Sequence, residues 1–229
     1  MIIEKITKIG ERSNNQDSLM SFVEEKLHIC VIAVADGVGS YEESDICSQF
    51  VTAFLEKFIN DEKETIKGML LEDLEILLYN KVKEVHNRLL YIAKEKGIKY
   101  GTTLTLCLIV ENTFIVVQVG DSRCYIYQNA VLRQITKDQT LKERKNVLLQ
   151  ALGHSQIEPM LYDGILEGQY EILLCTDGLT NELEPGDIRK VLKAGYSEKE
   201  KLETLADMAC RAGEKDNISA VIIKNNGGW

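Results

Sequence analysis

Apolar residues recur along the chain at two different spacings, which predict two kinds of secondary structure. From Ile46 to Ile59 they recur every three or four residues, the spacing of one helix face. A second helix is predicted from about Lys63 to Lys96, where Gly97 would end it. Short apolar runs typical of strands come before these helices, at Ile3–Ile9, Asp17–Val23 and His28–Ala35.

The second half of the chain returns to strand-like runs, several of them separated by short polar turns. Glu111-Asn112-Thr113 and Gln128-Asn129-Ala130 each separate two such runs, as in β-hairpins. A helix-rich segment is predicted at about Asp187–Ala212. The predicted strands are Thr102–Val110, Phe114–Val119, Arg123–Tyr127, Val131–Ile135, Tyr170–Thr176 and Ile218–Ile223.

Hairpin-joined strands with helices grouped between them favour antiparallel sheets covered by helices. Several of the predicted strands are apolar on both faces, which indicates two sheets packed face to face with the helices outside. The chain of 229 residues contains only two prolines and no repeat or linker-like tract. We therefore expect a single domain over residues 1–224 and a short tail over 225–229.

Net charge and cysteine usage narrow the class of protein. The formal net charge of −9 argues against a nucleic-acid or anionic-membrane surface, since both require an excess of Lys and Arg. None of the six cysteines forms a CxxC pair, and four lie in apolar runs, as reduced and buried thiols do. No apolar run approaches the roughly 20 residues that cross a bilayer. A cytoplasmic protein without nucleic-acid or membrane partners is expected.

Five aspartates lie at the ends of predicted strands. Asp36, Asp121 and Asp177 follow strands, whereas Asp17 and Asp216 precede them. In an antiparallel sheet the end of one strand lies beside the start of its neighbour, so these acids can converge on one edge. Two carboxylates about 4 Å apart repel by roughly 4 kcal/mol at an effective dielectric constant near 20. A converged group would therefore hold protons or hard cations such as Mg²⁺ or Mn²⁺.

Each acidic motif by itself is also typical of an ordinary turn, and only their order is specific. That order resembles the motif series of the metal-dependent protein phosphatases of type 2C, from Arg12 to about Ile223. The matching motifs are Arg12-Ser13-Asn14-Asn15-Gln16-Asp17, Asp36-Gly37-Val38-Gly39-Ser40, Gly101-Thr102-Thr103, Gly120-Asp121-Ser122-Arg123, Lys137-Asp138-Gln139-Thr140, Ala151-Leu152-Gly153, Thr176-Asp177-Gly178-Leu179 and Asp216-Asn217-Ile218-Ser219.

The resemblance implies an αββα sandwich and a protein serine/threonine phosphatase that uses a metal-activated water. It implies two Mn²⁺ or Mg²⁺ ions, with a third held by Asp121 and Asp177, and a phosphorylated protein substrate from a Ser/Thr kinase pathway. The implied site residues are Asp36 as the bridging metal ligand, the Gly37 carbonyl and Asp17 on one ion, Asp177 and Asp216 on the other, Asn217 beside the ligands, and Arg12 on the substrate phosphate.

The chain departs from the family pattern at several positions. Val38 and Gln139 stand where histidines are common, and Ser40 replaces a glycine in a change between small residues that should fit. Only the ten residues Leu141–Gln150 occupy the interval in which bacterial relatives carry a longer flap, so a more open site is expected.

These departures leave an alternative open, a catalytically weak or inactive phosphatase-like module that binds a regulatory partner. The complete set of aspartates favours the enzyme, because a binding module has no need of a repulsive anionic cluster. A calcium-binding loop and a Ser-His-Asp hydrolase are both disfavoured, since the chain lacks the motif of either.

Overall fold

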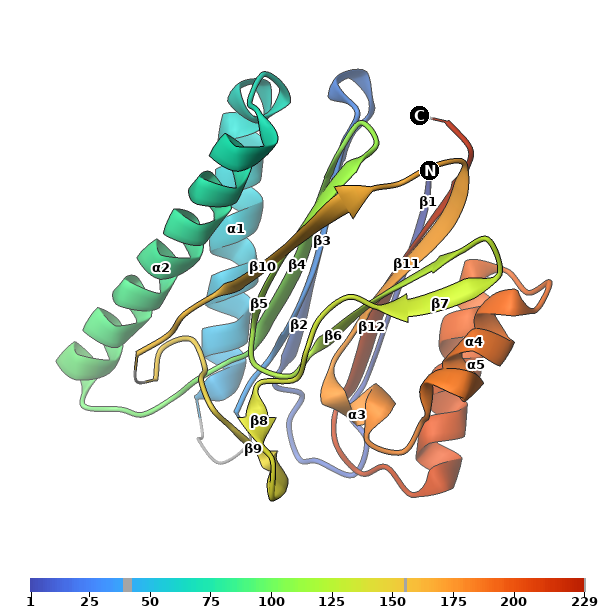
Figure 1. Cartoon of the computed structure of the whole chain (residues 1–229). Helices are drawn as coiled ribbons and strands as arrows, with labels where there is room; N and C mark the ends of the chain where they lie inside the picture. The colour runs from blue at the N-terminus through green and yellow to red at the C-terminus, as the bar shows by residue number, and fades with distance from the viewer. Residues whose placement is uncertain (39–42, 155, 229) are drawn as a thin grey trace.

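Two five-stranded antiparallel sheets lie face to face, and each is covered on its outer side by helices (Figure 1). The computed structural model describes residues 1–38, 43–154 and 156–228. Sheet A has the strand order β1 (Ile2–Lys8), β12 (Ile218–Asn226), β11 (Gln169–Cys175), β6 (Arg123–Gln128) and β7 (Val131–Gln134). Sheet B has the order β10 (Met160–Ile165), β5 (Thr113–Val119), β4 (Leu104–Val110), β3 (Ile29–Asp36) and β2 (Asp17–Glu24).

Helices cover the two outer faces, so the predicted αββα sandwich is confirmed (Figure 1). The helices α1 (Ser44–Lys67) and α2 (Leu71–Lys96) lie on sheet B, while α4 (Pro185–Lys193) and α5 (Glu198–Ala212) lie on sheet A. The remaining elements are the 3-10 turn η1 (Glu25–Leu27), the short helix α3 (Asp177–Thr180) and a small hairpin of β8 (Thr140–Leu141) and β9 (Arg144–Leu148).

Strand β3 shows why several strands are apolar at every position. Its side chains alternate between two cores because successive residues of a strand point to opposite faces. Val31 packs toward α1 and α2, whereas Ile32 packs between the two sheets. A third core lies between sheet A and its helices, where Leu173 of β11 contacts residues of α4 and α5. The four layers are therefore held together by three separate apolar cores.

The predicted boundary between the first two helices is wrong. The second helix was expected from about Lys63, but α1 continues to Lys67 and α2 begins at Leu71. Gly68 ends α1 by donating its N–H to the Thr65 carbonyl, and Leu70 has extended backbone. The apolar spacing continues through this break, so periodicity alone could not locate it.

The last strand is longer than predicted. The structure extends β12 from the expected end at Ile223 to Asn226, so Asn225 and Asn226 belong to sheet A and not to a tail. Asn225 is buried and donates a hydrogen bond to the Tyr170 hydroxyl. The last residues of this strand are polar, so they could not be predicted from apolar alternation, which is the main sequence signal for a strand.

No helix in the described residues combines the length and apolar character needed to cross a membrane. All six cysteines are unpaired; the four in apolar runs are buried, as predicted, and Cys47 is buried as well. Gly39 and Ser40 lie outside the described residues.

The inter-sheet core should dominate stability. Ile32 is fully buried between the sheets, so Ile32→Ala should lower the free energy of unfolding by about 2–5 kcal/mol in a urea titration. Ile165→Ala is the matched control, because Ile165 lies on β10 and is 61% exposed. Its effect should stay within about 0.5 kcal/mol. Equal losses in the two variants would contradict this assignment of the core.

Candidate metal centre

Carboxylates from separate segments of the chain meet at one end of the sandwich. A pocket of about 990 Å³ is lined by Asp36, Asp121, Asp177 and Asp216 together with Arg12. Gly37 also lines it. Asp17 is adjacent, since the register of β2 against β3 places it directly opposite Asp36. The structure thus brings together the five aspartates that the sequence placed at strand ends.

Asp17 and Asp36 are half-buried and lie opposite each other on β2 and β3. The Thr176 hydroxyl donates to Asp17 Oδ2 at 3.1 Å, while Asp17 Oδ1 is buried without a hydrogen-bond partner among the described residues. The backbone of Asp36 is held by Thr103, whose hydroxyl accepts from the Asp36 N–H at 3.0 Å and whose N–H donates to the Asp36 carbonyl at 2.8 Å. Thr102 Oγ1 donates to the same carbonyl at 2.9 Å.

Gly37 lies where two segments of backbone approach closely. A Cβ atom at this position would come within 2.7 Å of the carbonyl oxygens of Gln16 and Ser44, a distance that real Cβ atoms do not adopt. The Gly37 N–H donates to the Gln16 carbonyl at 3.1 Å. Glycine is therefore required for the loop after β3 to lie against the start of β2.

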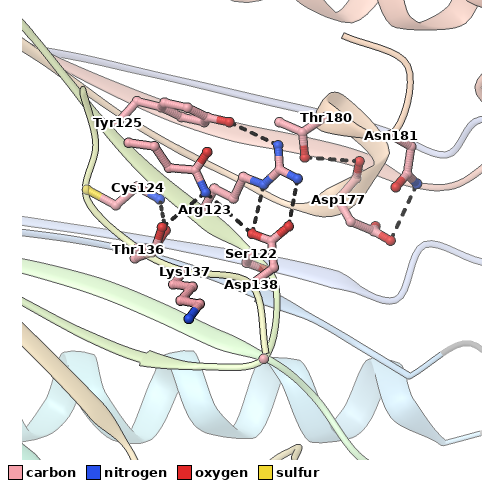
Figure 2. A network of polar contacts seen from close by, with 12 residues as sticks. Ser122, Arg123, Cys124, Tyr125, Thr136, Lys137, Asp138, Asp177, Thr180 and Asn181 are labelled. Atoms are coloured by element: carbon pink, nitrogen blue, oxygen red, sulfur yellow. Dashed lines mark hydrogen bonds and ion pairs between the residues drawn. The ribbon is translucent and has the colours of Figure 1, made fainter. Parts of the chain in front are cut away.

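Asp177 follows β11 and is the first residue of α3, so its carboxylate lies at the end of sheet A. The Asp36 and Asp177 carboxylates lie close together, and, besides burial, the charge of Asp177 contributes to the raised pKa of Asp36. Asn181 donates to Asp177 Oδ2 at 3.4 Å (Figure 2). A Cβ on Gly178 would lie 2.1 Å from the Asn217 carbonyl oxygen, so the absence of a side chain lets these two loops touch.

Arg12 and Asp216 are paired across the pocket. Arg12 Nη2 donates to Asp216 Oδ2 at 2.6 Å, and the Asn217 N–H donates to Asp216 Oδ1 at 2.8 Å. The Asn217 side chain accepts from the Gln16 N–H at 2.8 Å and donates to the Ile9 and Asn14 carbonyls. Asn217 therefore fastens the loop that carries Arg12 and Asp17 to the loop that carries Asp216.

Asp121 follows β5 and Gly120, and it also lines the pocket. Arg123 is two residues further on, and its guanidinium forms a fork on Asp138, with Nε and Nη2 at 2.9 Å and 2.7 Å from the two carboxylate oxygens (Figure 2). Its Nη1 also donates to the Tyr125 hydroxyl at 3.0 Å. This arginine is held by Asp138 and does not form an ion pair with Asp121.

Burial and mutual repulsion change the acidity of the group. Burial, followed by the charges of Asp177 and Asp216, raises the pKa of Asp17 to about 7. Burial and the neighbouring Asp177 likewise raise the pKa of Asp121 to about 7. The pKa values of Asp36 and Asp177 are also raised, chiefly by burial. Without cations, protons would neutralise much of this group at neutral pH.

The residues present fit a group of hard divalent cations. The donors are carboxylate oxygens, and one buried oxygen of Asp17 lacks a partner among the described residues. The acidic side chains that line the pocket outnumber its two arginines, Arg12 and Arg144. Among the described residues, no three or more His, Cys, Asp or Glu side chains are already arranged to hold an ion. Asp216 is paired with Arg12, so one of its carboxylate oxygens already has a partner.

Several residues at the pocket were not predicted from the sequence. Glu182, Glu214 and the hairpin residues Glu143 and Arg144 also line it. The hairpin β8–β9 occupies the interval where the flap is short, so this edge of the site has a small cover that the sequence did not reveal. Glu214 could have been found from its position two residues before Asp216, whose N–H it accepts at 2.8 Å.

Comparison with known proteins agrees with this geometry. A sequence profile described as Protein phosphatase 2C matches residues 7–217. The serine/threonine phosphatase stp of Listeria innocua is 31% identical over 94% of this chain and 92% of its own length. A bacterial serine phosphatase crystal structure superposes with a TM-score of 0.90 at 24% identity, covering 100% of this chain and 99% of that one, which shows the fold alone.

The serine/threonine phosphatase PstP/Ppp of Mycobacterium tuberculosis has a TM-score of 0.83 at 28% identity, covering 96% of this chain and 97% of that one. The chain belongs to the protein phosphatase 2C family. It is therefore a phosphoprotein phosphatase, a hydrolase of a family that depends on divalent metal ions. The alternative of a non-catalytic module receives no support from these relatives, which are named as phosphatases.

The raised pKa values predict how the stability of metal-free protein depends on pH. Asp17 and Asp121 titrate at about 7 when folded, against about 3.9 in an unfolded chain, so the folded state binds more protons between these values. The free energy of unfolding of chelator-treated protein should therefore fall as pH rises from about 5 to about 7. Asp17→Asn should flatten the slope, as measured by urea unfolding at several pH values. A slope that is positive in the wild type, or unchanged in the variant, would contradict the prediction.

Proposed function

We propose that this phosphatase hydrolyses phosphoserine and phosphothreonine in proteins with two Mn²⁺ or Mg²⁺ ions. Asp36 would bridge the ions, the Gly37 carbonyl and Asp17 would serve one of them, and Asp177 and Asp216 the other. Asp121 and Asp177 would hold a third ion. The observation that carries the proposal is the gathering of carboxylates from well-separated chain segments around one pocket that also contains Arg12.

Bound divalent ions would lower the pKa of water and neutralise charge on the phosphoryl oxygens. The protein itself contributes the negative charge of the carboxylates and holds them in position. Thr103 and Thr102 hold the backbone of Asp36, and Asn217 holds the loops of Asp17 and Asp216 together. Preorganised ligands avoid the cost of gathering repelling groups during the reaction.

Arg12 is proposed to bind the substrate phosphate. Its guanidinium offers a planar pair of N–H donors that match two phosphate oxygens. In the structure it is instead paired with Asp216 at 2.6 Å. Because Asp216 is also a proposed ion ligand, Arg12 would be free to bind the substrate phosphate when the site holds its ions. No histidine lines the pocket among the described residues, and water is therefore proposed as the proton donor to the leaving oxygen.

The substrates follow from the same chemistry. A phosphate monoester on a protein serine or threonine is the product of a Ser/Thr protein kinase, so we place this enzyme opposite such a kinase. The unpaired cysteines, five of them buried, support a reducing compartment such as the cytoplasm.

Neutralising either of two proposed ligand carboxylates should lower activity strongly. Asp36→Asn and Asp177→Asn should each lower Mn²⁺-dependent hydrolysis of a phosphothreonine peptide by at least about a hundredfold, because each removes a ligand charge on which ion binding depends. Asp163→Asn is the matched control, since Asp163 is exposed on β10, away from the pocket. Full activity in both site variants would rule out this ligand assignment.

Loss of Arg12 should separate substrate binding from metal binding. Arg12→Ala should raise the KM for a phosphopeptide roughly tenfold or more, since hydrogen bonds to charged groups contribute about 1.5–3 kcal/mol. The same variant should bind Mn²⁺ more tightly in calorimetry, because Asp216 loses its competing cation. Weaker Mn²⁺ binding would contradict the competition between the two partners of Asp216.

A further inference from the structure

We propose that Gln139 is a positioning residue for Asp121, and that it links this carboxylate to the β8–β9 hairpin at the pocket edge. The inference rests on the proposed function, in which Asp121 takes part in holding an ion. Gln139 lies outside the pocket lining and would act only through the backbone that carries Asp121.

The contacts of Gln139 converge on Gly120, the residue before Asp121. Gln139 Oε1 accepts from the Gly120 N–H at 2.7 Å, and the Gln139 N–H donates to the Gly120 carbonyl at 3.1 Å. Gln139 therefore bonds both backbone polar groups of Gly120, and the carbonyl also accepts from Gln118 Nε2 at 3.2 Å, so only the Gly120 N–H depends on Gln139 alone. Gln139 is 6% exposed, so water competes little for these bonds.

Gly120 is held just as closely on its other side. Its φ of +105° is one that residues with a side chain rarely adopt, and a Cβ atom would lie 2.6 Å from Thr103 Cγ2. Thr103 also bonds the Ser122 hydroxyl at 2.7 Å. The turn at Gly120 therefore packs against Thr103 on one side and is hydrogen-bonded to Gln139 on the other. Thr103 also bonds the backbone of Asp36.

The Asp121 side chain depends on this turn for its position. Within the described residues its carboxylate makes no hydrogen bond to another side chain, unlike Asp17, Asp177 and Asp216. It is nevertheless largely enclosed and lines the pocket. Its direction is therefore set by its own backbone, which is fixed by the bonds to Gly120.

Gln139 also connects the turn to the hairpin. Gln150 Nε2 donates to Gln139 Oε1 at 2.7 Å, and the Leu149 N–H donates to the Gln139 carbonyl at 2.8 Å. Gln150 in turn exchanges two bonds with the backbone of Glu158, at 2.6 and 3.0 Å. The hairpin residues between Gln139 and Gln150 include Arg144, which lines the pocket. Gln139 Oε1 accepts from both Gln150 and Gly120, so a movement of the hairpin would also move the backbone that carries Asp121.

The test compares Mn²⁺ binding in four full-length proteins by calorimetry: the wild type, Gln139→Leu, Asp121→Asn and the double variant. Leucine keeps the volume of glutamine but removes the acceptor for the Gly120 N–H. Gln139→Leu should lower the affinity for the Mn²⁺ ion that depends on Asp121 about tenfold, because loss of a residue that orients a ligand typically has an effect of this size. The Asp121→Asn protein should show no further weakening when Gln139→Leu is added.

Asn225→Leu is the matched control, because Asn225 is a buried and hydrogen-bonded amide outside the pocket lining. It should lower the melting temperature without changing Mn²⁺ affinity. Unchanged Mn²⁺ affinity in Gln139→Leu, equal weakening in the control, a further loss in the double variant, or wild-type binding insensitive to Asp121→Asn would each overturn the proposal. Failure of the proposed function is distinguishable, since it would appear as wild-type protein without Mn²⁺-dependent hydrolysis.

Discussion

Mutual repulsion among buried carboxylates is the constraint on which this structure depends. The β2–β3 register places Asp17 opposite Asp36, and Asp177, which begins α3 at the end of sheet A, lies close to Asp36. Such a group opposes folding unless protons or cations neutralise it. The three apolar cores supply the opposing free energy, because β3 packs on both faces and carries Asp36 at its end. The rigid sandwich thus holds its ligands in place against their own repulsion.

Much of the fold was predictable because the buried strands are long apolar runs, and several of these runs end at an aspartate. Asp36 follows seven consecutive buried residues, and such runs show clearly in the sequence. The convergence of the acids followed from antiparallel pairing alone. The break at Gly68 and the strand β10 were not predictable in this way, because the first interrupts no apolar period and the second is a mostly exposed edge strand.

The site was predictable in its residue types but not in its contacts. The aspartates could be recognised from the order of the motifs. The pairing of Arg12 with Asp216 could not, since it joins residues 204 positions apart. Gln139 appeared in the sequence only as a departure from the family pattern, and its role depends on the conformation of Gly120, which no local spacing encodes.

The loops fastened by Asn217 come from the two ends of the domain. Asn217 bonds Asn14 and Gln16, and β1 pairs with β12 along its whole length. During synthesis the residues of the first loop must therefore wait until Asn217, about 200 positions later, has left the ribosome. Contacts of such long sequence separation slow folding. A growing chain could not assemble the site before Asp216 and Asn217 were available to join the loop of Arg12 and Asp17.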